Sequence, residues 1–437
     1  MEQPAQLLND ELIAENQHVY EMLSNLGKAL YYPKGILTQS AEAKQKATKY
    51  NATIGIATEG DGPMYLPLIQ DTLSSYNPED IYTYAPTQGK PELRKAWKEK
   101  MLKENPSLQG KSIGDPIVTN ALTHGLSIIA DMFADVNDTL ILPDKFWGNY
   151  KLVFNIRRGA NIKTYRLFNE QQQFNAEGLR EAILQQKDNG KAIVLLNFPN
   201  NPTGYTPTVD EVDQIVAVIK ECAESGINIV AVTDDAYFQL FFEDSIKESI
   251  FAKLANIHDR VLAVKIDGAT KEEYVWGFRV GFITYASKSQ KVLKVLEEKT
   301  KGIIRGTISS SPHPTQTFVL KAIQSPEFED QKQQKYVIMK KRANKVKELL
   351  INTEKYKEVW SFYPFNSGYF MCLKLHNINA ETLRLHLLDK YGVGTISINA
   401  TDLRIAFSCV EESELENLFE LIYQAAKELS NERAEML

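Results

Sequence analysis

Several features are scarce in this 437-residue sequence, and each absence argues against a class of protein. The three cysteines, Cys222, Cys372 and Cys409, lie far apart and lack metal-ligand spacing. We therefore expect buried structural thiols in a reducing compartment, with neither a disulfide framework nor a metal site. The net charge of −6 provides no excess of basic residues for a nucleic-acid partner.

Long apolar runs are missing as well. No segment approaches the roughly 18 apolar residues that a membrane span needs. The first residues, MEQPAQLLNDELIAENQ, carry acidic side chains where a signal peptide needs basic ones, and no apolar core follows them. We therefore expect a cytoplasmic protein that does not contact membranes. Hydrophobic residues make up 43% of the chain, which is enough for a sizeable buried core.

The usual nucleotide-binding motifs are also absent. No G-x-G-x-x-G follows a predicted strand, and Gly110-Lys111-Ser112 lacks the earlier glycine of a phosphate loop, since Asn105 stands there. A nucleotide-binding α/β enzyme is therefore one alternative that the sequence disfavours. A non-catalytic binding protein or regulator is the other, because the first 50 residues are too few and too weakly basic for an added DNA-binding domain.

The middle of the chain does contain short apolar runs that alternate with helical patterns. The runs at 138–143, 192–198, 227–232 and 261–266 are rich in β-branched residues and predict strands that are covered on both faces. Residues 209–226 predict a helix between the second and third strands. Thr208 and Glu211 form a capping box at its start, and Gly226 marks its end. This order predicts a mainly parallel, doubly wound sheet.

The two ends of the chain have a different pattern. A long helix is expected from about residue 326, followed by the strand-like segments SGYFMCLKL and LRIAFSC and a last helix. We predict an α/β protein whose large domain, 86–320, holds the parallel sheet with flanking helices. Residues 1–85 would form an N-terminal arm and part of a smaller α+β domain, which residues 321–437 would complete.

Polar side chains follow three of the predicted strands directly. They are Asn201, Asp234, Tyr237, Lys271 and Arg279. Taken singly, each has an ordinary explanation as a turn residue, a helix cap, a solvated lysine or an outward-facing arginine. Ligands of open α/β sheets bind beyond the carboxyl ends of the strands, so five such residues in this order predict one site at one edge of the sheet.

This set of groups suits one kind of cofactor. An amine forms a Schiff base with an aldehyde, and a carboxylate keeps a pyridinium nitrogen protonated. At about 4 Å and an effective dielectric constant near 20, that pair is worth roughly 4 kcal/mol. An amide and a phenol can donate hydrogen bonds to a ring oxygen, and a guanidinium matches a phosphate. The residues therefore predict pyridoxal 5′-phosphate.

The same residues resemble motifs of the fold type I pyridoxal-phosphate enzymes, and within them the class I/II aminotransferases, especially the aspartate aminotransferase group. The resemblance extends from about residue 50 to 410. It includes N-P-T-G at 201–204, D-x-A-Y at 234–237 and K-x7-R-x-G from Lys271. It implies that Asn201 and Tyr237 contact the phenolic oxygen and that Asp234 pairs with the pyridinium. Lys271 would hold the internal aldimine, and Arg279 the phosphate.

Three further motifs are similar to those of the family. F-W-G-N-Y at 146–150 implies that Trp147 stacks on the pyridine face, with a buried core tryptophan as the alternative. The turn at 119–125 implies that Ala121, Leu122 and Thr123 cradle the phosphate, as a helix N-terminus can. Y-A-P-T-Q-G at 84–89 implies that Tyr84 reaches the phosphate of a neighbouring subunit, and therefore a homodimer.

The resemblance also bears on the substrate. L-R-I-A-F at 403–407 implies that Arg404 clamps the α-carboxylate, and such a bidentate pair orients the Cα–H bond. Arg305 would bind a distal carboxylate across the dimer, or else lie on the surface or beside the phosphate. Ala57, with Asn201 and Trp147, is expected to contact substrate too. Aspartate or glutamate and aromatic amino acids both stay open as substrates.

Two positions depart from the family pattern. Gly268 stands where the family commonly has serine or threonine, so we expect phosphate binding to depend on Arg279, Thr123 and Thr270. Tyr150 stands where the aspartate group often has histidine, and its phenol can hydrogen-bond Asp234. We predict a ping-pong transamination between an L-amino acid and a 2-oxo acid. A β-lyase or an amino-acid decarboxylase, which would use the same residues, is the alternative.

Overall fold

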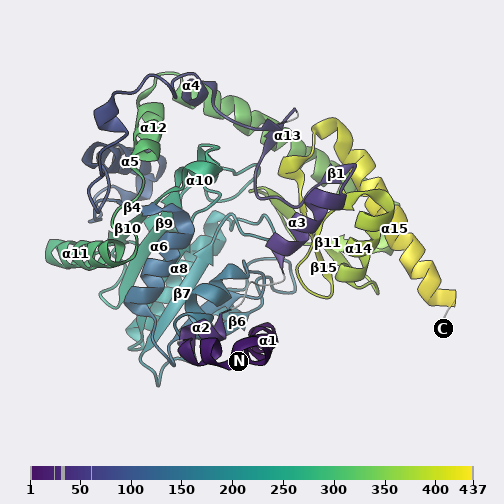
Figure 1. Ribbon diagram of the computed structural model, residues 1–437, viewed down its shortest axis with the longest axis horizontal. Coiled ribbons are helices and arrows are strands. Elements are labelled where there is room, and N and C mark those ends of the chain that lie inside the picture. The colour runs from purple at the N-terminus through teal and green to yellow at the C-terminus, as the bar shows by residue number, and fades with distance from the viewer. Residues whose placement is uncertain (1, 24, 31–34, 61, 436–437) are drawn as a thin grey trace.

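The computed structural model describes residues 2–23, 25–30, 35–60 and 62–435. A seven-stranded sheet forms the centre of the larger part of the molecule (Figure 1). Strand β10 runs antiparallel to both of its neighbours, β4 and β9, whereas the other pairs are parallel. In spatial order the strands are β4 (Ile117–Asn120), β10 (Val280–Ala286), β9 (Val261–Gly268), β8 (Asn228–Asp234), β7 (Lys191–Asn197), β5 (Thr139–Pro143) and β6 (Asn161–Tyr165).

Helices cover both faces of this sheet, which explains why its central strands are mostly apolar. In β7, Ile193 and Leu195 join the hydrophobic cluster that includes the buried face of α6, whereas Val194 and Leu196 join the cluster of α7 and α8. Side chains alternate between the two faces of a strand, so a strand that is buried on both faces is apolar at successive positions and not only at alternate ones. The helices of this part are α5 (Pro91–Glu104), α6 (Ala121–Phe133), α7 (Ala176–Leu184), α8 (Val209–Glu224), α9 (Ile250–Leu254), α10 (Ala269–Glu272), α11 (Gln290–Thr307) and α12 (His313–Gln324).

Helix α8 begins and ends as its sequence predicts. The Thr208 hydroxyl accepts a hydrogen bond from the Glu211 amide, and the Glu211 carboxylate accepts one from the Thr208 amide at 2.8 Å. Gly226, just beyond the helix, has a φ of +104°, a conformation that glycine adopts without steric cost. The predicted strand–helix–strand unit and the mainly parallel sheet are therefore confirmed.

A second, antiparallel sheet lies beside the first, and both ends of the chain contribute to the layer around it. Near the start of the chain, β1 pairs in parallel with β13, and α3 packs against β13 and α14. Figure 1 shows α3, in purple, beside these later elements. In spatial order the strands of the sheet are β11 (Trp360–Phe362), β12 (Phe370–Leu375), β15 (Asp402–Ala406) and β14 (Ile396–Ser397). The elements around it are α3 (Ile36–Lys46), β1 (Tyr50–Asn51), β13 (Val393–Gly394), α13 (Phe328–Asn352), α14 (Ala380–Tyr391) and α15 (Leu415–Glu435).

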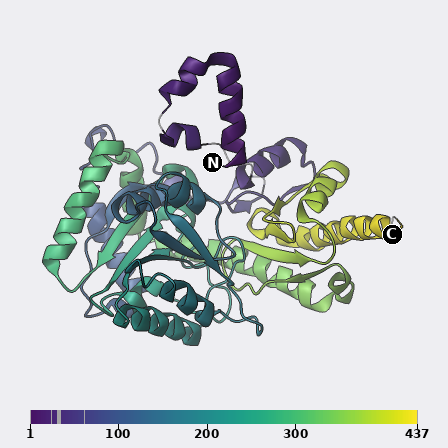
Figure 2. The same cartoon turned by 90° about the horizontal axis from the view of Figure 1, so that it is seen from below.

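The first two helices stand out from the rest of the molecule (Figure 2). An ion pair of 2.7 Å between Glu2 and Lys151 joins them to a π-helical turn at 151–156. These helices are α1 (Gln3–Met22) and α2 (Asn25–Ala29). Three further short elements are β2 (Thr58–Glu59), β3 (Gly62–Pro63) and α4 (Pro67–Gln70). Within the described ranges, none of the helices has the length and apolar character needed to cross a membrane.

All three cysteines are free thiols, but they are not all buried as expected. Cys222 and Cys372 are buried, whereas Cys409 is half-buried. The Cys409 thiol lies 3.2 Å from each of the carbonyl oxygens of Ile54 and Ile56, so it has hydrogen-bond acceptors although it is not fully enclosed.

Candidate active site

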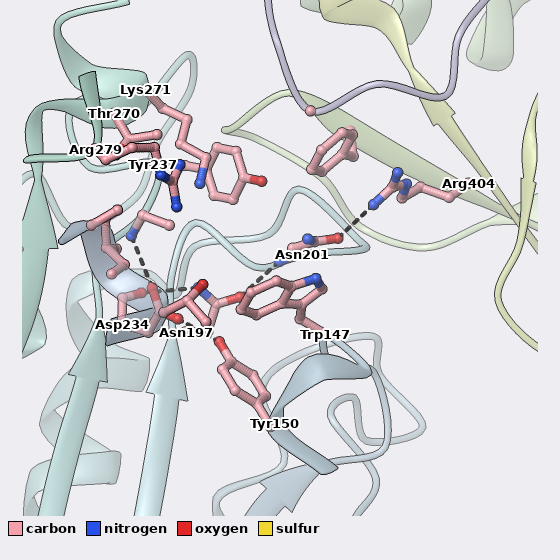
Figure 3. A pocket seen from close by; sticks show the side chains of 16 residues that line it. Trp147, Tyr150, Asn197, Asn201, Asp234, Tyr237, Thr270, Lys271, Arg279 and Arg404 are labelled. Carbon is pink, nitrogen blue, oxygen red and sulfur yellow. Dashed lines mark hydrogen bonds between the residues drawn. The ribbon is translucent and has the colours of Figure 1, made fainter. Parts of the chain in front are cut away.

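A cavity of about 190 Å³ opens between the carboxyl ends of the large-sheet strands and the small sheet. It brings together twelve of the residues that the sequence predicts for the site. Figure 3 shows Lys271, Thr270 and Arg279 on one side and Arg404 on the other, with Tyr237, Asn201 and Trp147 between them. The predicted residues that line the cavity are Ala121, Leu122, Thr123, Trp147, Tyr150, Asn201, Asp234, Tyr237, Thr270, Lys271, Arg279 and Arg404.

Asp234 is the last residue of β8 and is buried at the floor of the cavity. Its carboxylate accepts a hydrogen bond of 2.7 Å from the Tyr150 hydroxyl and one of 3.1 Å from the Ala236 amide. Burial raises the pKa of Asp234, and the hydrogen bond from Tyr150 opposes that shift. A buried carboxylate with a raised pKa gains stability from a cation placed beside it.

Lys271 lies in the short helix α10, directly after β9. Its Nζ is 5.0 Å from the centre of the Tyr237 ring. Burial lowers the pKa of this amine to about 8, the negative charge of Asp234 opposes the shift, and the positive charge of Arg279 adds to it. A larger share of this amine is therefore neutral, and so nucleophilic, at neutral pH than for an ordinary lysine.

One wall of the cavity presents hydrogen-bond donors and a positive charge. Ala121, Leu122 and Thr123 form the first turn of α6, where backbone amides lack helical partners. The buried Thr270 hydroxyl has no hydrogen-bond partner among the described residues. Arg279 also lines this wall. Its backbone has a φ of +57°, a left-handed conformation that is costly for any residue except glycine.

Gly268 and Gly281 allow this wall to form. A Cβ at Gly268 would lie 2.5 Å from the Val280 carbonyl oxygen, and one at Gly281 would lie 2.7 Å from the Ala121 carbonyl carbon. Neither gap can hold a side chain. A serine at position 268, as in the family pattern, is therefore incompatible with the close approach of β9 and β10 in this chain.

Arg404, on β15 of the small sheet, is buried and faces the cavity from the opposite side. Its guanidinium donates to the Asn201 side-chain oxygen at 3.0 Å and to the Thr53 carbonyl at 2.9 Å, and it stacks on Phe370 at 4.1 Å. The Nε atom has no hydrogen-bond partner, and no carboxylate pairs with this arginine anywhere in residues 2–23, 25–30, 35–60 and 62–435. Burial lowers its pKa, as is typical of an uncompensated cation.

Comparison with known proteins identifies the family. The model of aminotransferase class I and II matches residues 68–422. The chain belongs to this family. It is 26% identical over 396 residues to a probable aspartate/prephenate aminotransferase of Aquifex aeolicus, covering 88% of this chain and 94% of that protein. It is 28% identical over 267 residues to an aspartate aminotransferase of Bacillus subtilis, covering 60% of this chain and 63% of that protein.

Solved structures agree with the fold. An aminotransferase of Anaerococcus prevotii superposes with a TM-score of 0.82 at 23% identity, covering 93% of this chain and 99% of that one. A multiple substrate aminotransferase of Thermococcus profundus gives a TM-score of 0.79 at 15% identity, covering 95% and 100%. Identities this low establish the fold type I architecture alone. The family match makes this aminotransferase an enzyme that uses pyridoxal 5′-phosphate.

The cavity of this aminotransferase fits that cofactor chemically. It offers an amine of lowered pKa at Lys271 and a buried carboxylate at Asp234. It also offers an unpartnered hydroxyl at Thr270 beside the first turn of α6 and the Arg279 guanidinium. A neutral binding pocket would need none of these groups, whereas an aldehyde, a ring nitrogen and a phosphate need all of them.

Three residues expected at the site lie away from the cavity of the single chain. Tyr84 is 95% exposed, and Arg305 is an exposed residue of the last turn of α11. Ala57 is fully buried in the core and is not part of the cavity wall, where Gly55 is found instead. The Ala57 carbonyl accepts a hydrogen bond from the Met64 amide, which holds this segment against the core.

Some cavity residues were not assigned a role from the sequence. Asn197, at the end of β7, donates to the Asp234 carbonyl at 2.9 Å and accepts from the Asn201 amide at 2.9 Å, so it holds two strand ends together. An amide at the end of an apolar run was the available signal. Nothing in the sequence indicated Phe370, because it reaches Arg404 only through pairing of β12 with β15. The others are Gly55 and Ala236.

Proposed function

We propose that this enzyme moves an amino group between an L-amino acid and a 2-oxo acid by a ping-pong mechanism, with aspartate or glutamate as one partner. The observation that carries the proposal is Arg404, a buried guanidinium without a carboxylate partner in the described chain, which faces Lys271 across the cavity. Removing a cation from water is expensive unless a ligand compensates it. The carboxylate of an amino acid is such a ligand, and it would direct the Cα atom toward Lys271.

Pyridoxal phosphate, when bound, supplies an aldehyde for the amino group and a ring that withdraws electrons from Cα. Lys271 is the amine that would hold that aldehyde, and Asp234 the carboxylate that would keep the ring nitrogen protonated. Asn201 and Tyr237 would donate to the ring oxygen, and Trp147 would lie on the ring face. The phosphate would lie against the amides of Ala121, Leu122 and Thr123, with Thr270 and Arg279.

Once the amino acid has displaced it, Lys271 would be free to move a proton at Cα. A general base is most effective when its pKa lies near the working pH, and the pKa of about 8 at Lys271 meets that condition. Burial is the main cause of this value, so enclosure in the cavity would itself lower the pKa of Lys271 into the range that a general base needs.

The substrate assignment draws on the relatives that are named aspartate aminotransferases. Arg305 lies outside the single-chain cavity, so a distal carboxylate would have to be bound by Arg305 of a second subunit. The exposed Tyr84 would reach a neighbouring phosphate in the same homodimer. Tyrosine is enriched in protein–protein interfaces. A tyrosine that is exposed in the single chain, such as Tyr84, therefore supports a subunit contact around this residue.

The test is a panel of L-amino acids assayed with 2-oxoglutarate and oxaloacetate, with full analysis of products. We expect equal amounts of a new amino acid and a new 2-oxo acid, with the highest kcat/KM for aspartate or glutamate. Release of carbon dioxide or of ammonia in place of the new amino acid would indicate a decarboxylase or a β-lyase instead. Lys271→Ala should abolish turnover, and wild-type rates in that variant would refute the assignment.

A further inference from the structure

His124 lies one residue beyond the cavity wall, in the first turn of α6. Its Nδ1 atom accepts a hydrogen bond of 3.0 Å from the backbone amide of Asn120. Asn120 is the residue that precedes the helix, and its own side chain makes no capping bond. The imidazole therefore caps the helix by reaching backward to the Asn120 amide.

The neighbours of His124 select its neutral form. Its Nε2 atom is 3.5 Å from the Thr307 hydroxyl oxygen, in the last turn of α11. That hydroxyl donates to the Ile303 carbonyl at 2.8 Å, so its oxygen is left to accept from an Nε2–H. An amide donor at Nδ1 and an acceptor at Nε2 together define an imidazole that carries its proton on Nε2. Burial lowers the pKa of His124, which favours the same neutral form, with Asp131 opposing the shift and Arg157 adding to it.

The cap also supports a strained turn. Ala121, the first residue of α6, has φ at +63°, a conformation that costs on the order of 1–3 kcal/mol for a residue with a Cβ. The Thr119 hydroxyl donates to the Ala121 carbonyl at 2.9 Å, and the Asn120 amide, which lies between these two residues in the chain, donates to His124. The backbone of residues 121–123, which line the cavity, is therefore held by hydrogen bonds on both sides of the turn.

In a capping box the backward bond comes from a glutamate or glutamine three residues after the N-cap, whereas His124 makes it from four residues after Asn120. A carboxylate there would occupy the positive end of the helix, where an anion is to bind, and would repel that anion. A neutral imidazole satisfies the same backbone amide without adding negative charge. A histidine at position 124 therefore avoids the repulsion that a glutamate there would exert on an anion bound at residues 121–123.

We propose that His124 is a positioning residue that caps α6 as a neutral imidazole, fixing the amides of the phosphate turn while leaving the helix N-terminus free of negative charge. This inference rests on the proposed function, in that the anion at this turn is taken to be the phosphate of the cofactor.

The test compares His124→Gln with His124→Glu, two side chains of the same length that can both accept from the Asn120 amide and differ in charge. For each apoprotein we would measure the melting temperature and the dissociation constants of pyridoxal phosphate and of inorganic phosphate. We expect both variants to melt close to the wild-type protein and His124→Gln to bind both ligands nearly as well. His124→Glu should weaken binding of both by roughly tenfold, the effect of one unfavourable charge at a helix terminus.

His124→Ala, which deletes the cap, should lower both the melting temperature and the affinity, and the glutamine variant should restore them. Equal affinities in the glutamine and glutamate variants would refute the role of charge, and wild-type behaviour of the alanine variant would refute the cap. Failure of the proposed function looks different, because the wild-type protein would then bind pyridoxal phosphate without transferring an amino group to a 2-oxo acid.

Discussion

Arg404 and Asn201 are joined by a hydrogen bond of 3.0 Å although 203 positions separate them in the chain. Arg404 belongs to the small sheet, and Asn201 belongs to the turn after β7 of the large sheet. The contact links the two sheets at the wall of the cavity that lies opposite Lys271. It leaves the Nε atom of Arg404 without a partner in the described chain, so this N–H is available to a ligand.

Replacing Arg404 by lysine should weaken binding of the amino acid and leave the cofactor in place. Lysine keeps the positive charge but loses the planar fork that matches a carboxylate. Loss of a hydrogen bond to a charged group costs about 1.5–3 kcal/mol, so kcat/KM should fall roughly ten- to a hundredfold. Steady-state kinetics would measure the fall, and an unchanged cofactor absorbance spectrum would serve as the control. A lost spectrum would instead assign Arg404 to cofactor binding.

Tyr150→Phe should weaken cofactor binding, because it removes the 2.7 Å hydrogen bond to the Asp234 carboxylate. The pKa of Asp234 is already raised by burial and should rise further, which weakens its pairing with a pyridinium. We expect a loss of about 1.5–3 kcal/mol in the free energy of cofactor binding. Tyr165→Phe is a matched control, since the buried Tyr165 hydroxyl has no hydrogen-bond partner in the described part of the chain. Equal affinities in the two variants would contradict the role of Tyr150.

The rate at which the apoprotein binds pyridoxal phosphate covalently should rise with pH and level off above about 8. Only the neutral amine of Lys271 is nucleophilic, and its pKa is about 8. Asp234→Asn should move the midpoint to lower pH, because the charge of Asp234 opposes the downward shift of the Lys271 pKa. Stopped-flow absorbance across the pH range would measure both midpoints. A wild-type midpoint near that of an ordinary lysine would show that burial does not tune this amine.

Gly268→Ala should destabilise the protein, since the added Cβ would lie 2.5 Å from the Val280 carbonyl oxygen and 2.7 Å from the Gly281 Cα. Overpacking of this kind typically costs about 1–3 kcal/mol in the free energy of unfolding. Gly277→Ala is the matched control, because a Cβ there meets no atom within 4 Å. Chemical denaturation of both variants would measure the difference. A Gly268→Ala protein as stable as wild type would mean that β9 and β10 can separate without cost.

Much of this arrangement follows from local patterns in the chain. Continuous apolar runs predicted strands that are buried on both faces, and the Thr208–Glu211 pair predicted the start of α8. Because the carboxyl ends of parallel strands share one edge, the residues after β7, β8 and β9 had to meet there, and Asn201, Asp234 and Lys271 do line one cavity. These inferences need only the residue types and the direction of each strand.

Other features depend on distances between segments that the sequence does not specify. The close contact of β9 with β10 excludes a side chain at Gly268, and no periodicity in the chain indicates that contact. Phe370 and Thr53 meet Arg404 only after β12 and the N-terminal segment have packed against β15. The pKa of Lys271 likewise has no local cause, since burial and the charges of Asp234 and Arg279 act through space. Residue type and order were thus sufficient to locate the reactive groups, whereas their ionisation and partners required the packed fold.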